Sequence, residues 1–158
     1  MKIVWNEGHT TPISERAITA TVRGETEPLT DVVLCAPDYL APVPCCSVTR
    51  ERLSEGFKIT TSIALDQHRA VQRALTEAGV TCHMLAAAPG MPDLCFTRDV
   101  AVTTPWGVVV LNPAKTHRRR EAEHFARAAQ AWTGSEVARV TQGVIEGGDI
   151  ASRVLACS

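Results

Sequence analysis

Apolar runs separated by turn residues predict a strand, a helix and a second strand in the first half of the chain. Residues 31–36 form a compact apolar run that ends at Pro37, as expected for a buried strand. Apolar residues recur at steps of three and four over residues 62–78, which predicts an amphipathic helix that Gly79 ends. Residues 80–85 alternate and predict another strand. The strand–helix–strand order favours a parallel pairing of the two strands.

The second half of the chain predicts a hairpin followed by a helix and a strand. Residues 99–104 and 107–111 are strand-like runs joined by two turn residues. Residues 117–132 carry apolar side chains on one helical face, and Gly134 ends that helix. Residues 136–141 predict a further strand. The order from the hairpin onward is therefore β-β-α-β, and the fold class is α/β.

The remaining segments lack hydrophobic periodicity. Residues 1–28 are interpreted as an N-terminal extension, with a short strand at residues 18–22. The segment after Pro37 contains Pro42 and Pro44 and is predicted to be a surface loop. We therefore divide the chain into this extension, an α/β domain at residues 29–150, and a C-terminal tail at residues 151–158.

Composition narrows the classes of function. The 158 residues carry a formal net charge of -1, which argues against nucleic-acid binding by a strongly basic surface. No apolar run reaches the roughly 20 residues that a membrane span requires. The first residues lack the apolar segment of a signal peptide, so the sequence predicts a cytoplasmic protein without membrane partners.

Cysteines and histidines do not form a recognisable metal site. The six cysteines include no Cys-x-x-Cys pair, and free thiols are expected in a cytosolic protein. We interpret Cys35 and Cys82 as small buried hydrophobic residues. His117, Glu121 and His124 share a helical stripe, but a metal site of the carboxylate-bundle type needs a second such motif. We therefore interpret this stripe as a polar helix face.

Three short polar segments carry the candidate chemistry. They are the Asp99 motif (Phe96-Thr97-Arg98-Asp99), the Arg118 motif (Arg118-Arg119-Arg120-Glu121) and the Glu146 motif (Ile145-Glu146-Gly147-Gly148-Asp149). Paired carboxylates suit a planar guanidinium, which presents five N–H donors, and an arginine suits the carboxylate of an amino acid. Taken singly, each segment also has a plain structural interpretation. Asp99 would cap a turn, the arginine run would be a solvated helix start, and the two glycines would supply positive φ in a tight hairpin turn.

Taken together, the three motifs resemble the guanidine-modifying superfamily, which includes arginine deiminase, dimethylarginine dimethylaminohydrolase and the amidinotransferases. The separations of Asp99 from Arg118 and from Glu146 are close to those of the dimethylarginine hydrolase branch. The resemblance covers roughly residues 30–150. It implies a pentein-type α/β propeller built from ββαβ modules, of which this sequence would hold a truncated, N-terminal part.

The resemblance also implies roles for individual residues. Asp99 and Glu146 would bind the substrate guanidinium, and Glu146 would also support the proton transfers of catalysis. Arg118, or its neighbour Arg119, would bind the substrate carboxylate. Glu121 and Asp149 would hold these side chains in place. The substrate would be arginine-like, and no metal or other cofactor would be needed.

The sequence departs from the superfamily in the groups that perform the covalent step. Family members use a cysteine thiolate to attack the guanidinium carbon and a histidine as general acid and base. Both lie beyond the Glu146 motif in longer chains, whereas this sequence offers there only Cys157, which we consider a poor candidate. Three hypotheses follow: an N-terminal portion without the nucleophile, a split enzyme in which another polypeptide supplies the histidine and the cysteine, or a non-catalytic α/β domain that binds arginine-like ligands. The protein partner expected for this chain is a complementing chain or, in a homo-oligomer, a second copy. The sequence does not choose between hydrolysis and amidino transfer.

Overall fold

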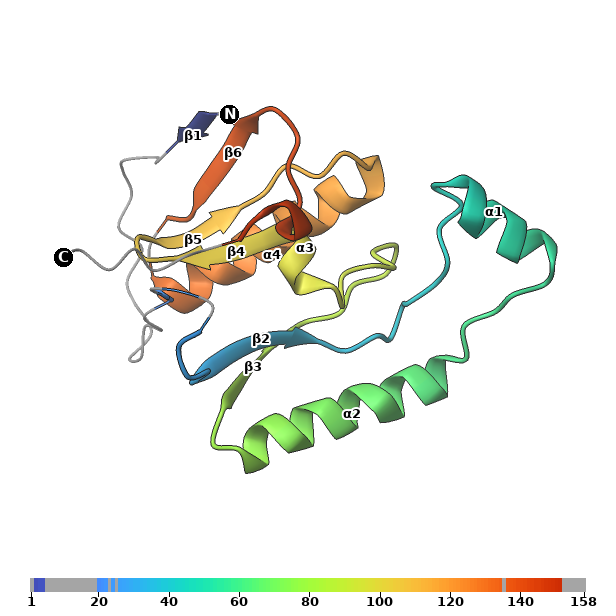
Figure 1. Ribbon diagram of the computed structural model, residues 1–158, viewed down its shortest axis with the longest axis horizontal. Helices are drawn as coiled ribbons and strands as arrows, with labels where there is room; N and C mark the ends of the chain where they lie inside the picture. The colour runs from blue at the N-terminus through green and yellow to red at the C-terminus, as the bar shows by residue number, and fades with distance from the viewer. Residues whose placement is uncertain (1, 5–19, 23, 25, 135, 152–158) are drawn as a thin grey trace. The chain divides into compact units, whose positions relative to one another are not determined.

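The computed structural model describes residues 2–4, 20–22, 24, 26–134 and 136–151. The chain divides into two units, which are considered separately below (Figure 1). Unit 1 contains residues 1–28 and 98–158, and unit 2 contains residues 29–97. The candidate site residues all lie in unit 1: Asp99, Arg118, Arg119, Glu121, Glu146 and Asp149.

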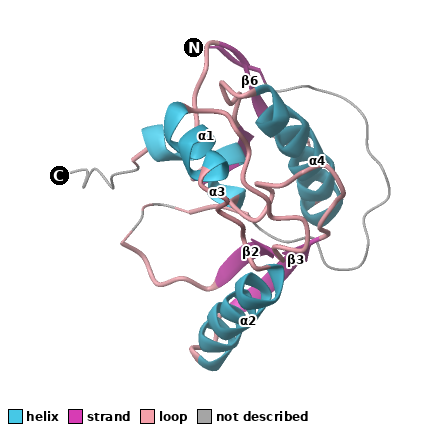
Figure 2. Ribbon diagram, turned by 90° about the vertical axis from the view of Figure 1, so that its right-hand side faces the viewer, coloured by secondary structure: helices cyan, strands magenta, loops and turns pink. Residues whose placement is uncertain are grey.

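Unit 2 is built around two parallel strands and a long helix. Strand β2 (Asp31–Cys35) pairs in parallel with β3 (Thr81–Leu85), and Asp31 lies opposite Thr81 at one end of the register. Helix α2 (Thr61–Glu77) connects the strands and contacts β3 (Figures 1 and 2). This arrangement confirms the predicted strand–helix–strand unit and its parallel pairing.

Helix α2 leaves its apolar face largely open in this unit. None of its residues is buried, and Ile63 and Val71 are 55% and 53% exposed. Burial is concentrated instead on the strands, where Cys35 and Leu85 are almost fully covered. Cys82 is only partly buried, so its interpretation as a buried residue was too strong.

The segment predicted as a loop contains a short helix, α1 (Ser47–Ser54). Its sequence is mostly polar and buries no side chain, so it has no hydrophobic periodicity to detect. The helix instead has an N-cap, because the Cys46 sulfur accepts a hydrogen bond from the Thr49 N–H. The loop prediction was therefore wrong over this stretch.

Unit 1 contains a four-stranded sheet in the order β1-β6-β5-β4. The strands are β1 (Lys2–Val4), β4 (Ala101–Thr104), β5 (Gly107–Val110) and β6 (Ala138–Gln142). β4 and β5 form the antiparallel hairpin, and β5 continues through helix α4 (Thr116–Thr133) into the parallel strand β6. The predicted β-β-α-β order is confirmed. β1, which pairs antiparallel with β6, was not predicted.

Helix α4 packs against the sheet and supplies much of the core of this unit. Its buried side chains include Phe125, Ala126 and Ala129, and the Phe125 ring meets Trp132 edge to face. Gly134 ends the helix at φ 63°, as its position in the sequence predicted. Val109 of β5 and Ala138 and Val140 of β6 form a buried cluster with Leu111, which directly follows β5.

The predictions of a propeller and of the two terminal segments can be compared with the structure only in part. The described residues form a four-stranded sheet and a separate strand pair, so they support the α/β class but show no closed propeller. Of the strand expected at residues 18–22, residues 20–22 are described and are not in a strand, so the prediction was wrong there, while residues 18 and 19 lie outside the described residues. All but one residue of the tail also lie outside them. Among the helices that the structure describes, none is both long and apolar enough to cross a membrane.

Candidate guanidino-binding site

The first turn of α4 contains a buried ion pair. Arg118 Nη1 lies 2.8 Å from Glu121 Oε2, one helical turn along, and both side chains are almost completely buried. A buried charge requires a partner, and each of these two residues provides one for the other. The interpretations of a solvated arginine run and of a polar helix face were therefore wrong for Arg118 and Glu121, although Arg119 and Arg120 are exposed.

The same arginine holds Asp99. Arg118 Nη2 donates to Asp99 Oδ2 at 3.2 Å, while the Asp99 side chain remains 45% exposed. Asp99 lies in the short helix α3 (Thr97–Val100), immediately before β4, and not in the strand that its sequence predicted. Asp99 therefore has a partly exposed carboxylate, and the buried Arg118, itself paired with Glu121, holds one of its oxygens.

The Glu146 motif forms a capped 3-10 turn, η1 (Gly147–Asp149). Glu146 and Asp149 make a reciprocal capping box, in which Asp149 Oδ2 accepts the Glu146 N–H at 3.0 Å. Neither Gly147 nor Gly148 has positive φ, so the predicted glycine-dependent hairpin turn was wrong. Asp149 thus acts on the backbone of Glu146, which fixes the start of the turn.

An isolated β-bridge between Asn112, just after β5, and Ile145 anchors this turn to the sheet. Ile145 donates its N–H to the Asn112 carbonyl at 3.0 Å, and the Asn112 side chain donates to the Gly143 carbonyl at 2.6 Å. A second anchor comes from the Asp99 motif, since Arg98 Nη2 donates to the Ile150 carbonyl at 3.2 Å. The structure therefore brings the Asp99 and Glu146 motifs into contact.

A family model described as "N,N dimethylarginine dimethylhydrolase, eukaryotic" matches residues 47–138, more than half of the chain. This matched segment contains the Asp99 and Arg118 motifs.

The chain belongs to the dimethylarginine dimethylaminohydrolase family.

Individual relatives agree with this assignment. The N(G),N(G)-dimethylarginine dimethylaminohydrolase of Pseudomonas aeruginosa is 32% identical over 88 residues, which cover 55% of this chain and 35% of that enzyme. The crystal structure of a cysteine-to-serine mutant of the P. aeruginosa enzyme with citrulline matches 77% of this chain at a TM-score of 0.59 and 24% identity. This chain covers 46% of that structure, so it spans less than half the length of these relatives.

The fold is shared more widely. The N-terminal domain of ArgZ, a cyanobacterial arginine dihydrolase solved with its product, matches 75% of this chain at a TM-score of 0.62 and 18% identity. This chain covers 42% of that domain. At such identities the likeness to solved structures shows the fold alone. The superfamily resemblance found in the sequence is thus confirmed, with the dimethylarginine dimethylaminohydrolase branch as the family.

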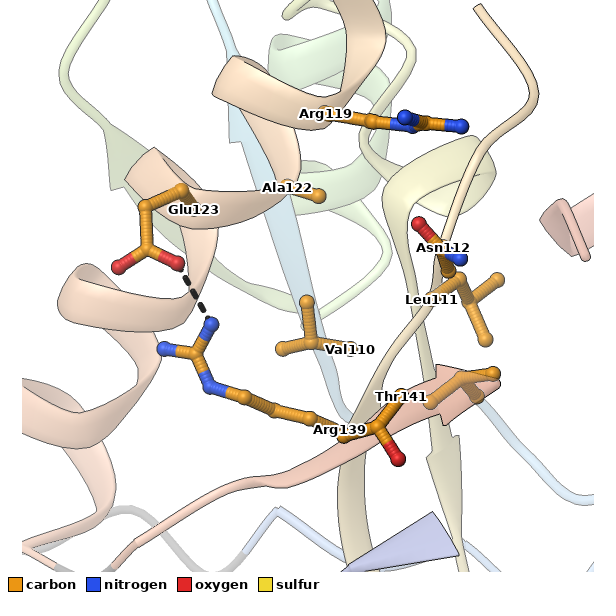
Figure 3. A pocket seen from close by; sticks show the side chains of 9 residues that line it. Val110, Leu111, Asn112, Arg119, Ala122, Glu123, Arg139 and Thr141 are labelled. Carbon is orange, nitrogen blue, oxygen red and sulfur yellow. Dashed lines mark hydrogen bonds and ion pairs between the residues drawn. The ribbon is translucent and has the colours of Figure 1, made fainter. Parts of the chain in front are cut away.

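Arg119, the second candidate for binding a substrate carboxylate, lines a separate open hollow of about 250 Å³ (Figure 3). Its Nε donates to the Pro113 carbonyl at 3.1 Å. Across the hollow, Arg139 and Glu123 form an ion pair at 2.6 Å, and this contact lowers the pKa of the Glu123 carboxyl below its usual value. Neither Asp99 nor Glu146 lines this hollow.

The groups expected to perform the covalent step are not placed by this structure. Cys157 lies outside the described residues. Within the described residues, no group of three or more His, Cys, Asp or Glu side chains could hold a metal ion.

Proposed function

We propose that this chain forms the guanidino-binding part of a dimethylarginine dimethylaminohydrolase-type site. Asp99 and Glu146 would accept hydrogen bonds from the guanidinium of an arginine-like ligand. Charge-assisted bonds between a guanidinium and carboxylates are among the stronger polar contacts in proteins. Membership of the family supports the substrate class, because the family is named for the hydrolysis of dimethylarginine.

The single observation that carries the proposal is the way in which Asp99 is held. Arg118 uses one amino group for Glu121 and the other for Asp99 Oδ2, and only Asp99 of these three reaches solvent. Asp99 Oδ1 has no partner among the described residues. A carboxylate with one oxygen fixed and one free is suited to receiving a cationic ligand in a defined orientation.

Glu146 is proposed as the second carboxylate and as a group that supports proton transfer. Its capping box with Asp149 fixes its backbone, and its side chain is partly exposed. Arg118, the first candidate for the substrate carboxylate, is buried and uses both amino groups for Glu121 and Asp99, so we do not assign that role to it. We propose the alternative, its neighbour Arg119, whose side chain is exposed, for the substrate carboxylate.

The reaction of the complete site would be hydrolysis. A thiolate would attack the guanidinium carbon, dimethylamine would leave, and water would release the thiolate and give citrulline. This chain covers 35% of its P. aeruginosa relative, and we propose that the thiolate and the general acid–base histidine come from outside the residues described here. The transfer of an amidino group to an amine is not favoured by any contact in the site.

Calorimetric titration of the purified chain with L-arginine and with dimethylarginine tests the binding role. Asp99→Asn keeps the shape of the side chain and removes its charge, so we expect affinity to fall roughly 10- to 100-fold, the equivalent of one charged hydrogen bond. Arg120→Gln provides the control, because Arg120 lies in the same helical turn but is exposed. Equal affinity of wild type and Asp99→Asn would contradict the proposal.

A citrulline assay tests the origin of the nucleophile. We expect no citrulline from the chain alone with either ligand. Turnover that disappears in Cys157→Ser would show that Cys157 is the nucleophile and would overturn the proposal that the thiolate comes from elsewhere.

A further inference from the structure

Gly147 packs closely against the backbone of Arg98. Gly147 is buried, and a Cβ atom placed on it would overlap the Arg98 carbonyl oxygen and lie 2.7 Å from the carbonyl carbon. The same atom would lie 3.0 Å from Arg98 Cγ. Because Gly147 does not have positive φ, glycine is required there for space and not for backbone conformation.

The next residue provides an internal contrast. Gly148 lies in the same 3-10 turn, and a Cβ atom placed on it would meet no atom within 4 Å. It does not have positive φ either, so alanine fits there without strain. Of the two glycines in the Glu146 motif, only Gly147 is therefore required by the packing.

A hydrogen bond holds the same two segments together on the far side of the turn. Arg98 Nη2 donates to the Ile150 carbonyl at 3.2 Å, directly after the last residue of η1. The backbone of Arg98 thus presses against the first residue of the turn, and its side chain binds the residue that follows the turn. Arg98 itself is exposed, so this hydrogen bond is not part of the core.

These contacts have a direct consequence for the two proposed ligand-binding carboxylates. Asp99 follows Arg98, and Glu146 precedes Gly147. Since consecutive Cα atoms are about 3.8 Å apart, the Arg98–Gly147 contact brings the Cα atoms of Asp99 and Glu146 to within on the order of 10 Å. A ligand held by two carboxylates requires their separation to be fixed to about half an ångström.

We infer that Arg98 and Gly147 are positioning residues that set the separation of the Asp99 and Glu146 carboxylates. This inference rests on the proposed function, because it concerns the geometry of the same guanidino site. A Cβ at position 147 would push the Glu146 turn away from α3. The two carboxylates would then no longer meet one guanidinium at the same time, although each could still meet a simple cation.

Comparing two ligands distinguishes a change in the separation of the Asp99 and Glu146 carboxylates from a general loss of folded protein. Arginine and ornithine share the amino-acid end, but ornithine offers an ammonium group, which is a compact charge without the planar set of donors. Loss of folded protein lowers the apparent affinity for both ligands by the same factor. A change in carboxylate separation lowers the affinity for arginine more, so the ratio of the two affinities is the informative quantity.

The experiment compares wild type, Gly147→Ala and Gly148→Ala by titration with L-arginine and L-ornithine. We expect the arginine-to-ornithine affinity ratio to fall about 10-fold in Gly147→Ala, the loss of roughly one charged hydrogen bond. The ratio in Gly148→Ala should stay within about twofold of wild type, because alanine fits at that position. An unchanged ratio in Gly147→Ala, or equal losses in both variants, would overturn the inference.

Arg98→Met provides a variant that is expected to fold even if Gly147→Ala does not, since the Arg98 side chain is exposed. It removes the hydrogen bond to Ile150, and we expect the affinity ratio to fall about threefold. A ratio equal to that of wild type would remove Arg98 from the inference. If wild type binds no arginine at all, the proposed function fails and takes the inference with it. If wild type binds arginine and both Gly147→Ala and Arg98→Met keep the wild-type arginine-to-ornithine affinity ratio, only the inference fails.

Discussion

Helices α2 and α4 have similar amphipathic sequences, but α4 buries six of its side chains and α2 buries none. The two helices also differ in what they pack against within their own units. Helix α4 belongs to a unit with a four-stranded sheet, whereas α2 is joined to a pair of strands. A strand pair offers a narrow apolar surface, which cannot cover the face of a 17-residue helix.

The difference extends to polar residues. In α4 the buried face includes the Arg118–Glu121 pair, which fixes the exposed Asp99. In α2 the charged pair Asp66–Arg69 lies on the surface, where an ion pair adds little to stability. Periodicity therefore identifies a helix and its apolar face, while burial depends on the partner that the fold supplies.

The largest effect is expected from Phe125→Ala in α4. Phe125 is buried against Trp132, and the substitution would lower the free energy of unfolding of unit 1 by about 3–5 kcal/mol. Trp106 and Trp132 belong to unit 1 and residues 29–97 contain no tryptophan, so denaturant unfolding followed by tryptophan fluorescence reports on unit 1. A loss below about 1 kcal/mol would mean that α4 is not the core helix that we describe.

Glu121→Gln should also destabilise unit 1, by about 3 kcal/mol, because it leaves the buried Arg118 without its nearest charged partner. The remaining contact with Asp99 keeps the loss toward the lower end of the range for buried ion pairs. The same unfolding experiment measures it. Arg120→Gln, at an exposed position in the same turn, should leave the unfolding free energy unchanged within about 0.5 kcal/mol.

Val71→Ala in α2 is expected to change the unfolding free energy by no more than about 0.5 kcal/mol, with a slight gain from the better helix propensity of alanine. Hydrogen exchange of the α2 amides checks this, because unit 2 contains no tryptophan. Strong destabilisation would show that Val71 is buried in solution, and the contrast between the two helices would disappear.

The smallest effect concerns the acid stability of unit 2. A hydrogen bond with His83, at 2.8 Å, lowers the pKa of Asp31 below its usual value of 3.8. A lowered carboxyl pKa contributes stability above the unfolded-state value, and this contribution is lost as the pH falls through the folded-state value. Exchange of the β2 amides should therefore accelerate below about pH 4 more in wild type than in Asp31→Asn. Identical pH profiles would contradict this role of the pair.

The sequence predicts much of this fold because the principal elements carry strong local signals. The apolar run of β2, the three- and four-residue steps of α2 and the Gly134 stop of α4 all correspond to what is observed. Helix α1 lacks such a signal because it buries nothing. The three-residue strand β1 is too short to show a pattern, and its pairing with β6 is a long-range contact.

The candidate site was only partly accessible from the sequence. The motifs identify Asp99, Arg118 and Glu146, but the burial of Arg118 depends on the packing of α4 and cannot be read from a run of three arginines. The roles of Arg98 and Gly147 were missed, because a glycine required for close approach looks the same in sequence as one required for positive φ. The two adjacent glycines were the only sign of a close contact in the sequence, and they do not indicate which of them packs against Arg98.

The most direct test of the guanidino-binding role is an NMR titration of the ¹⁵N-labelled chain with dimethylarginine, in wild type and in Asp99→Asn. We predict saturable shifts that centre on the amides of Asp99 and of residues 146–149, and a marked loss of these shifts in Asp99→Asn. The absence of saturable shifts at these amides up to about 10 mM ligand, or identical shifts in both proteins, would contradict the central claim.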